Sequence, residues 1–240
     1  MAVETPPPRA IPGLSSARGL LFDMDGTMCD TDPIHMEVFS ELLLAHGKCG
    51  GVRIDDAFFR EKIAGRTNED IFGDLFPELT VPERETLWEK KEKDFRALAR
   101  SKLERLPGLT ELLDAATAAR VPFVAVTNAP RPNAELMLDA LGLAEAFAGR
   151  LVIGVECERA KPNPDPYLKG LDVLGVPRAD AAMCVAFEDS PTGCRAAVAA
   201  GVPTVGLLTA QPREALEKEG ASLCVENFAD AELAKRLIDA

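Results

Sequence analysis

From residue 107 onward the sequence alternates short apolar runs with amphipathic segments, and this alternation limits the possible folds more than any other feature. Short apolar runs between turn residues are typical of buried strands, and apolar residues spaced three or four apart are typical of helices. The apolar runs cover residues 122–126, 151–154, 183–187, 203–208 and 222–226. Helical patterns occur near residues 109–119, 132–142, 164–174, 191–200, 211–219 and 229–239. Strands that alternate with helices build parallel sheets, so we predict an α/β fold, a doubly wound parallel sheet with a Rossmann-like core that includes the apolar run at 19–22.

Residues 33–104 interrupt this alternation, because they contain no clear strand. Asp32 and Pro33 fit the N-cap and the first position of a helix that Gly47 ends. Further helical patterns cover residues 54–63, 67–75 and 81–99. We therefore predict a small, all-helical domain inserted after the first strand, with Pro107-Gly108 as the hinge where the chain returns to the sheet.

These features divide the chain into three parts. The predicted parts are a disordered tail at 1–17, a catalytic core at 18–32 and 105–240, and a helical cap at 33–104.

Composition and charge restrict the partners and the location of the protein. The 27 basic residues are outnumbered by 39 acidic ones, and a net charge of −12 disfavours binding to nucleic acid, which needs a basic patch. No apolar run reaches the ~20 residues of a membrane span, and the proline-rich start lacks the apolar core of a signal peptide. The six cysteines form no CxxC pair, which favours reduced thiols. We expect a cytoplasmic protein that binds neither nucleic acid nor membranes, with a monomer as the default state.

Polar side chains gather where the predicted strands end. Asp23 and Asp25 follow the first strand, Thr127-Asn128 follow the second, and Glu188-Asp189-Ser190 follow the fourth, while Lys161 lies between the third strand and its helix. Ligands of open parallel sheets bind beyond the carboxyl ends of the strands. Each group alone fits a turn, a helix cap or a solvated surface residue. Together they suit a hard divalent cation and a phosphate, which need oxygen ligands, a cation and hydrogen-bond donors.

Four motifs in this order resemble those of the haloacid dehalogenase-like hydrolase superfamily, in particular its members with a helical cap after the first strand. The motifs are "DMDGT" (23–27), "VTNA" (126–129), "KPNPDPY" (161–167) and "FEDSPTG" (187–193). The resemblance covers about residues 19–227 and looks closest to plant-type, low-specificity sugar and glycerol phosphate phosphatases.

The resemblance implies a catalytic role for five of these residues. Asp23 would attack phosphorus to give an aspartyl-phosphate, and Asp25 would act as the general acid and base. Thr127, the backbone N–H of Asn128 and Lys161 would hold the phosphoryl oxygens. Members that cleave carbon–halogen bonds lack the second aspartate, so its presence here favours phosphoryl transfer.

The resemblance also implies a magnesium ion. Its expected ligands are the Asp23 carboxylate, the backbone carbonyl of Asp25 and the Asp189 carboxylate, with waters completing an octahedron. Glu188 would add a ligand or hold a metal-bound water, and Ser190 would support the site from behind the ligands.

Residues of the predicted cap are candidates for contacts with the substrate. His35 is either a partner of Asp25 or the substrate, or a histidine at the entry of a helix. Arg66 and Asn68 are either contacts for substrate hydroxyls or a solvated helix start. In cap-bearing mutases the phosphate-binding arginine lies three residues after the matching glycine, a place that Asn68 takes here. Cys29, near the expected hinge, is either a redox brake or a small buried residue.

The sequence therefore predicts a Mg²⁺-dependent phosphatase for a small phosphorylated metabolite, either a sugar phosphate or a polyol phosphate such as glycerol phosphate. The alternatives are a sugar-phosphate mutase resembling beta-phosphoglucomutase and an inactive binding or regulatory protein. The inactive protein is disfavoured because the aspartates and Lys161 are all present.

Overall fold

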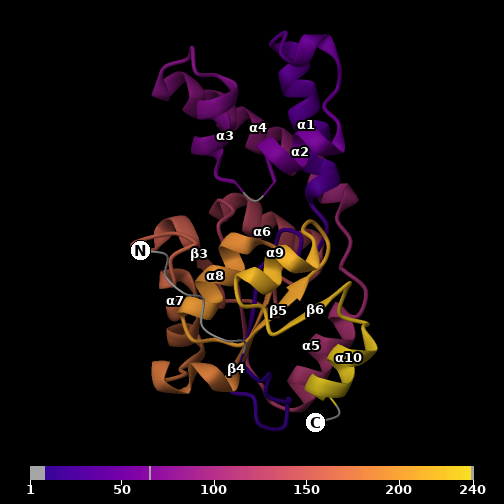
Figure 1. Cartoon of the computed structure of the whole chain (residues 1–240), viewed down its shortest axis with the longest axis vertical. Coiled ribbons are helices and arrows are strands. Elements are labelled where there is room, and N and C mark those ends of the chain that lie inside the picture. Colours follow the sequence, from indigo (N-terminus) through magenta and orange to yellow (C-terminus); the bar gives the residue numbers. More distant parts are fainter. Residues whose placement is uncertain (1–8, 65, 239–240) are drawn as a thin grey trace. The chain divides into compact units, whose positions relative to one another are not determined.

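The computed structural model describes residues 9–64 and 66–238, and its chain divides into two compact units (Figure 1). Unit 1 consists of the chain up to Asp30 and from Glu104 onward, and unit 2 consists of Thr31–Leu103. The return to unit 1 therefore occurs before Pro107-Gly108, and Gly108 instead precedes helix α5 (Leu109–Ala118) in a left-handed conformation with φ 82°.

Unit 1 is built on a parallel sheet that has six strands over the described residues, in the order β3-β2-β1-β4-β5-β6. The first strand lies in the middle, between β2 and β4, and its residues are fully buried. The strands are β1 (Gly19–Phe22), β2 (Phe123–Thr127), β3 (Leu151–Ile153), β4 (Cys184–Glu188), β5 (Thr204–Leu207) and β6 (Leu223–Val225). The predicted α/β fold with a helical segment after the first strand is confirmed.

Helices cover both faces of this sheet. Leu21 faces α7, where Gly170 leaves so little space that a Cβ would lie 2.8 Å from the Leu21 side chain. Phe22 points to the opposite face, where it packs against the aromatic rings of Phe147 and Phe228. The helices of unit 1 are α5 (Leu109–Ala118), α6 (Arg131–Ala140), α7 (Asp165–Leu174), α8 (Pro191–Ala199), α9 (Arg213–Lys218) and α10 (Ala231–Leu233).

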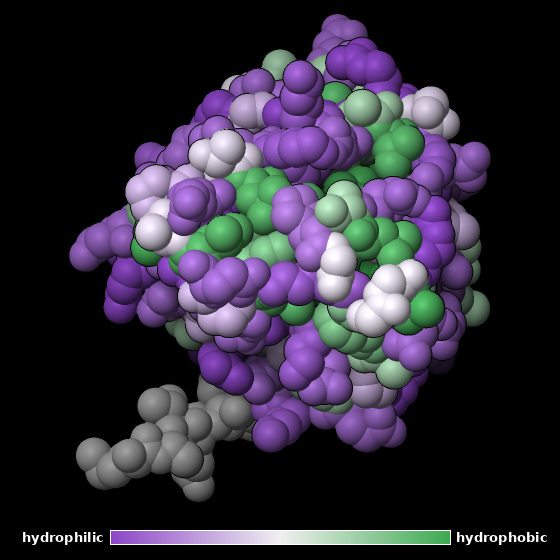
Figure 2. All heavy atoms as spheres, turned by 90° about the horizontal axis from the view of Figure 1, so that it is seen from above, coloured by the Kyte–Doolittle hydropathy of each residue, from purple (hydrophilic) through white to green (hydrophobic). Residues whose placement is uncertain are grey.

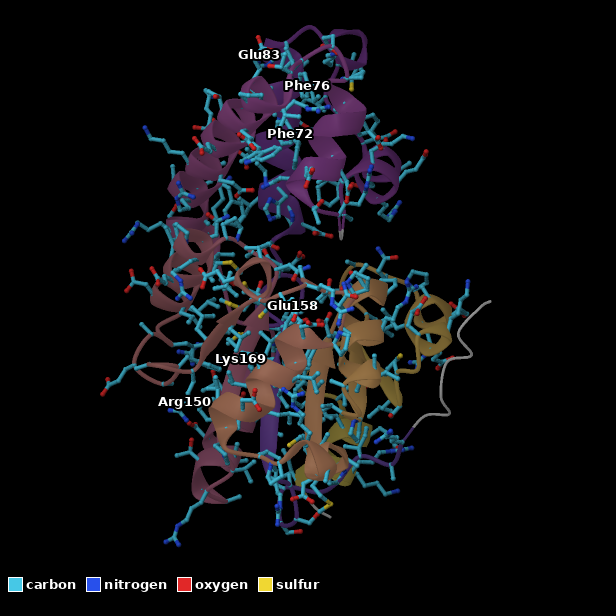
Figure 3. All side chains as sticks on the ribbon, turned by 90° about the vertical axis from the view of Figure 1, so that its left-hand side faces the viewer. Phe72, Phe76, Glu83, Arg150, Glu158 and Lys169 are labelled. Carbon is cyan, nitrogen blue, oxygen red and sulfur yellow. The ribbon has the colours of Figure 1, made fainter. Side chains whose placement is uncertain are left out.

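The described residues of unit 2 are helical, and their core is rich in phenylalanine. Phe72 and Phe76 are buried and point into the interior of the unit, whereas Glu83 points to solvent (Figure 3). Thr80 and Glu83 form a capping box at the start of α4, which satisfies backbone N–H groups of the first turn. The helices are α1 (Asp32–Ala45), α2 (Asp56–Lys62), α3 (Asn68–Leu75) and α4 (Val81–Lys102).

Two local predictions need correction. Helix α1 begins one residue earlier than predicted, with Thr31 as its N-cap and Asp32 in its first turn, where a negative charge suits the helix dipole. The predicted disordered tail is wrong for residues 9–17, because Leu14 is buried and its N–H donates to the Leu237 carbonyl at 2.7 Å. Residues 1–8 lie outside the described residues.

The surface seen from above is mostly hydrophilic, with apolar side chains gathered in small areas (Figure 2). None of the helices in the described part of the chain combines the length and the apolar character needed to cross a membrane.

Candidate active site

Lys161 is the centre of a buried polar cluster at the carboxyl ends of β1, β2 and β4. Its Nζ donates to Asp23 Oδ1 at 2.6 Å, to Glu188 Oε1 at 2.6 Å and to the Val126 carbonyl at 2.7 Å. A lysine ammonium has three donors, so all of them are used. The cluster therefore joins residues from three neighbouring strands through one cation.

Burial and charge pull the pKa values of this cluster in opposite directions. Burial raises the pKa of Asp23 well above its usual range; Lys161 opposes this shift, while Glu188 and Asp25 add to it. Burial acts to lower the pKa of Lys161, but the charges of Asp23 and Glu188 outweigh it and raise that pKa. Lys161 is consequently a permanent cation shared by two carboxylates.

Glu188 is enclosed by donors, which fixes its carboxylate. Besides Lys161, Oε1 accepts the Tyr167 hydroxyl at 2.7 Å, and Oε2 accepts the Ser190 hydroxyl at 3.1 Å. A Cβ on Gly193 would lie only 1.9 Å from this carboxylate, so the backbone of α8 closes the remaining side. The Ser190 Oγ also accepts the Gly193 N–H at 3.1 Å.

Asn128 and Thr127 are fixed by contacts of their own. The Asn128 side chain donates to the Lys161 carbonyl and accepts the Lys161 backbone N–H, both at 3.2 Å. The Thr127 hydroxyl oxygen accepts the Ala129 N–H at 2.9 Å and is buried, so its own proton can be donated. These contacts hold the end of β2 against the segment that carries Lys161.

The loop after β1 is held in a tight turn next to the acidic group. Gly26 has φ 71°, and its N–H donates to the Cys29 carbonyl at 2.8 Å. Its carbonyl accepts the Thr209 hydroxyl. A Cβ on Gly26 would lie 2.1 Å from Asp189 Oδ2, so only glycine allows this approach.

Three carboxylates offer a place for a cation. The carboxylate oxygens of Asp23, Glu188 and Asp189 lie within 4.8 Å of one another, and all three residues are buried. Oxygen ligands suit Mg²⁺, and three acids against one lysine leave an excess of negative charge, so the residues fit a divalent cation. Asp25, which was expected to contribute its carbonyl, is close enough to Asp23 for its charge to raise the pKa of Asp23.

The candidate residues of unit 2 belong to contacts within that unit. The His35 ring stacks on Phe95 with centroids 4.3 Å apart. Arg66 donates to the Asp74 carboxylate at 2.8 Å and to the Lys62 carbonyl at 2.9 Å.

Asn68 donates to Glu92 Oε1 at 2.7 Å, and Glu92 pairs with Lys91 at 2.9 Å. Both members of this pair are buried. The pair was not predictable from the sequence, because a charged dipeptide on a helix is typical of a solvated face.

Cys29 is fully buried, and burial, followed by the charges of Asp25 and Asp23, raises the pKa of its thiol well above the usual range. Only the thiolate reacts readily with oxidants, so this environment does not favour a redox brake.

Tyr167, Gly193 and Thr209 are site residues that the sequence reasoning missed. Tyr167 and Gly193 end the motifs "KPNPDPY" and "FEDSPTG", which was an available signal. Thr209 follows β5 without any motif.

The family model of haloacid dehalogenase-like hydrolases matches residues 17–201. Validoxylamine A 7'-phosphate phosphatase of Streptomyces hygroscopicus subsp. limoneus is 31% identical to this chain, over 82% of this chain and 88% of the relative. Fructose-1-phosphate phosphatase YqaB of Escherichia coli is 31% identical, over 78% of this chain and 94% of the relative.

Solved structures show the same architecture. A family IA hydrolase of Entamoeba histolytica superimposes with a TM-score of 0.79 at 25% identity, over 93% of this chain and all of that one. CbbY of Rhodobacter sphaeroides in complex with phosphate gives a TM-score of 0.75 at 26% identity, over 89% of this chain and 96% of that one.

Proposed function

Since the chain belongs to the haloacid dehalogenase-like hydrolase family, we propose that it is a Mg²⁺-dependent phosphatase of small sugar or polyol phosphomonoesters. The observation that carries this proposal is the buried Lys161, which bonds the Asp23 carboxylate at 2.6 Å beside the acidic residues Glu188 and Asp189. A carboxylate held by a cation in a water-poor site is suited to attack phosphorus. The names of the relatives, which include phosphatases of phosphorylated carbohydrates and of fructose 1-phosphate, support the substrate class.

The reaction divides into two displacements at phosphorus. An oxygen of Asp23 forms a bond to phosphorus while the bond to the leaving alkoxide breaks, and Asp25 gives its proton to that alkoxide. Asp25 then takes a proton from the water that attacks the aspartyl-phosphate, which releases inorganic phosphate and restores Asp23. Lys161 and the Thr127 hydroxyl neutralise and orient the phosphoryl oxygens in both steps.

Asp23, Asp189 and the backbone carbonyl of Asp25 would hold the magnesium ion. When bound, the ion supplies positive charge between the anionic nucleophile and the anionic phosphate. Both carboxylate oxygens of Glu188 already accept hydrogen bonds, from Lys161 and Tyr167 and from Ser190, so Glu188 is better suited to holding Lys161 in place.

We propose that side chains of unit 2 contact the leaving group, as the resemblance to cap-bearing members of the family implies. His35, Arg66 and Asn68 remain the candidates for these contacts. We propose that they accept several small sugar and polyol phosphates, as in plant-type low-specificity phosphatases.

Purified protein should release inorganic phosphate from a panel of small phosphomonoesters, and the Asp23→Asn variant should release none. EDTA should stop the reaction, and added Mg²⁺ should restore it. Asp172→Asn is a matched control on α7, where Asp172 forms a surface pair with Arg178, and it should keep full activity. Wild-type rates in Asp23→Asn would contradict the proposal.

A sugar-phosphate mutase is the second candidate, because a putative beta-phosphoglucomutase of Thermotoga maritima superimposes with a TM-score of 0.71 at 25% identity. A mutase should need a bisphosphate activator and should convert one sugar phosphate to another with little release of inorganic phosphate. Measuring inorganic phosphate and the converted sugar phosphate in one assay distinguishes the two activities.

A further inference from the structure

The phenol of Tyr167 is a second donor to the carboxylate oxygen that also holds Lys161. Its ring is fully buried, in the first turn of α7, and its hydroxyl donates to Glu188 Oε1 at 2.7 Å. Lys161 Nζ donates to the same oxygen at 2.6 Å and lies 5.1 Å from the centre of the Tyr167 ring. One side chain therefore contacts both members of the Lys161–Glu188 pair.

This arrangement matters because the ammonium of Lys161 has no spare donor. Asp23, Glu188 and Val126 use its three N–H groups. To hold a phosphoryl oxygen, Lys161 must weaken one of these three bonds. When the bond to Glu188 weakens, the buried charge of Glu188 is compensated less. A neutral donor on Glu188 Oε1 offsets that loss without adding charge.

The phenol is suited to this role because it keeps its proton. A phenol is protonated at neutral pH, and this one donates to Glu188 Oε1 at 2.7 Å. Tyr167 is therefore a permanent donor.

We infer that Tyr167 is a positioning residue, whose hydroxyl stabilises Glu188 so that Lys161 can turn toward the transferring phosphoryl group. The inference rests on the proposed phosphatase function. Tyr167 acts through Glu188 and Lys161, and it need not touch the substrate.

The Tyr167→Phe variant isolates the hydroxyl, because the ring that fills the core and faces Lys161 is retained. We expect kcat to fall by about 10-fold, which is typical when a group that supports a reactive residue is lost, while KM changes by less than about 2-fold. The matched control is Thr204→Val in β5, which removes another fully buried hydroxyl, bonded at 3.0 Å to the Val202 carbonyl. This control should keep the wild-type kcat.

A double-mutant cycle with Glu188→Gln tests the route of the effect. In the Glu188→Gln background, Tyr167→Phe should lower kcat by less than about 2-fold, because its target has already lost its charge. An independent signal comes from the ¹⁵Nζ resonance of Lys161, assigned by its absence in Lys161→Met. That resonance should shift in Tyr167→Phe and stay in place in Thr204→Val.

The inference is overturned by a wild-type kcat in Tyr167→Phe, by additive losses in the cycle, or by an unmoved Lys161 resonance. In all three cases the phosphatase function still stands. If the wild type releases no phosphate from any substrate, the proposed function fails, and the Lys161 resonance alone decides whether Tyr167 positions the ammonium.

Discussion

We expect the Lys161→Met substitution to lower both activity and stability by amounts that follow from the contacts of the ammonium. The change leaves the Asp23 and Glu188 carboxylates buried without their shared cation and removes a donor from the Val126 carbonyl. Breaking a buried ion pair by removing one partner costs about 3–5 kcal/mol. A loss of about 4 kcal/mol, at ~2–4 °C per kcal/mol for a unit of this size, lowers Tm by about 8–16 °C.

The loss of stability in Lys161→Met should depend on pH, because an unpaired buried carboxylate can take up a proton. Burial already raises the pKa of Asp23, and Lys161 is the main group that opposes this shift. A carboxyl whose pKa is higher in the folded state binds its proton more tightly there than in the unfolded chain. The stability of the variant should therefore rise relative to the wild type as the pH falls from 8 toward 5.

Thermal and urea unfolding in EDTA measure the stability, and phosphate release with Mg²⁺ measures the activity, which should fall by at least ~10²-fold. Adding Glu188→Gln to Lys161→Met should restore part of the stability, since one buried charge is removed, but none of the activity. The control Lys90→Met breaks a surface pair with Asp94 and should change the free energy of unfolding by less than ~0.5 kcal/mol. Wild-type stability in Lys161→Met, or a double variant no more stable than the single one, would refute the reasoning.

Two further predictions concern the close packing of the site. Gly193→Ala places a Cβ 1.9 Å from the Glu188 carboxylate, so it should lower stability by ~1–3 kcal/mol and kcat by at least ~10-fold, as measured by urea unfolding and phosphate release. Gly73→Ala lies inside α3, where the nearest atom is 3.7 Å away, so it should lower neither stability nor kcat, and equal losses from the two changes would contradict the steric argument. Iodoacetamide at pH 8 should modify the half-buried Cys49 well before the buried Cys29, as followed by peptide mass spectrometry; early labelling of Cys29 would revive the redox hypothesis.

The strands were predictable because most of their residues are buried on both faces. β2, β4 and β5 are entirely buried, so their sequences read as continuous apolar runs, and the predicted ranges match them within one residue at each end. The strand order was not predictable in this way. β1 pairs with both β2 and β4, and alternation of strands and helices does not specify which strand takes the middle.

Sequence signals for the start or end of a helix or of an ordered segment were less reliable where tertiary contacts compete with local preference. Asp32 fits a helix cap by type, yet α1 begins at Asp32 itself and Thr31 takes the cap position. The segment before β1 is rich in proline and polar residues, as disordered tails are. In residues 9–17, Leu14 is nevertheless buried and its N–H donates to the carbonyl of Leu237, more than two hundred residues away, a contact that no local pattern can reveal.

The site residues that follow strands were predictable, because parallel strands bring their carboxyl ends to one edge. The residues that hold them were not. Tyr167 reads as a core aromatic on the apolar face of α7, and Thr209 reads as a loop residue; their hydrogen bonds to Glu188 and Gly26 join positions 21 and 183 residues apart. Such hydrogen bonds follow no sequence periodicity, so only the folded structure reveals them.

The same geometry explains why so many acids can be buried at this edge. Lys161 and Asp23 are 138 residues apart in the sequence, so their pairing forms only when the sheet is assembled. One lysine compensates two carboxylates, with Asp189 close by, which leaves the edge negative. Burial, with the charges of Glu188 and Asp25, raises the pKa of Asp23 in spite of Lys161. A cluster packed for stability alone would pair each acid or replace it with an apolar residue. The excess of negative charge suits a divalent cation, which would neutralise part of it and help to keep Asp23 ionised, so the cluster is less stable than a fully paired one in exchange for a place for that cation.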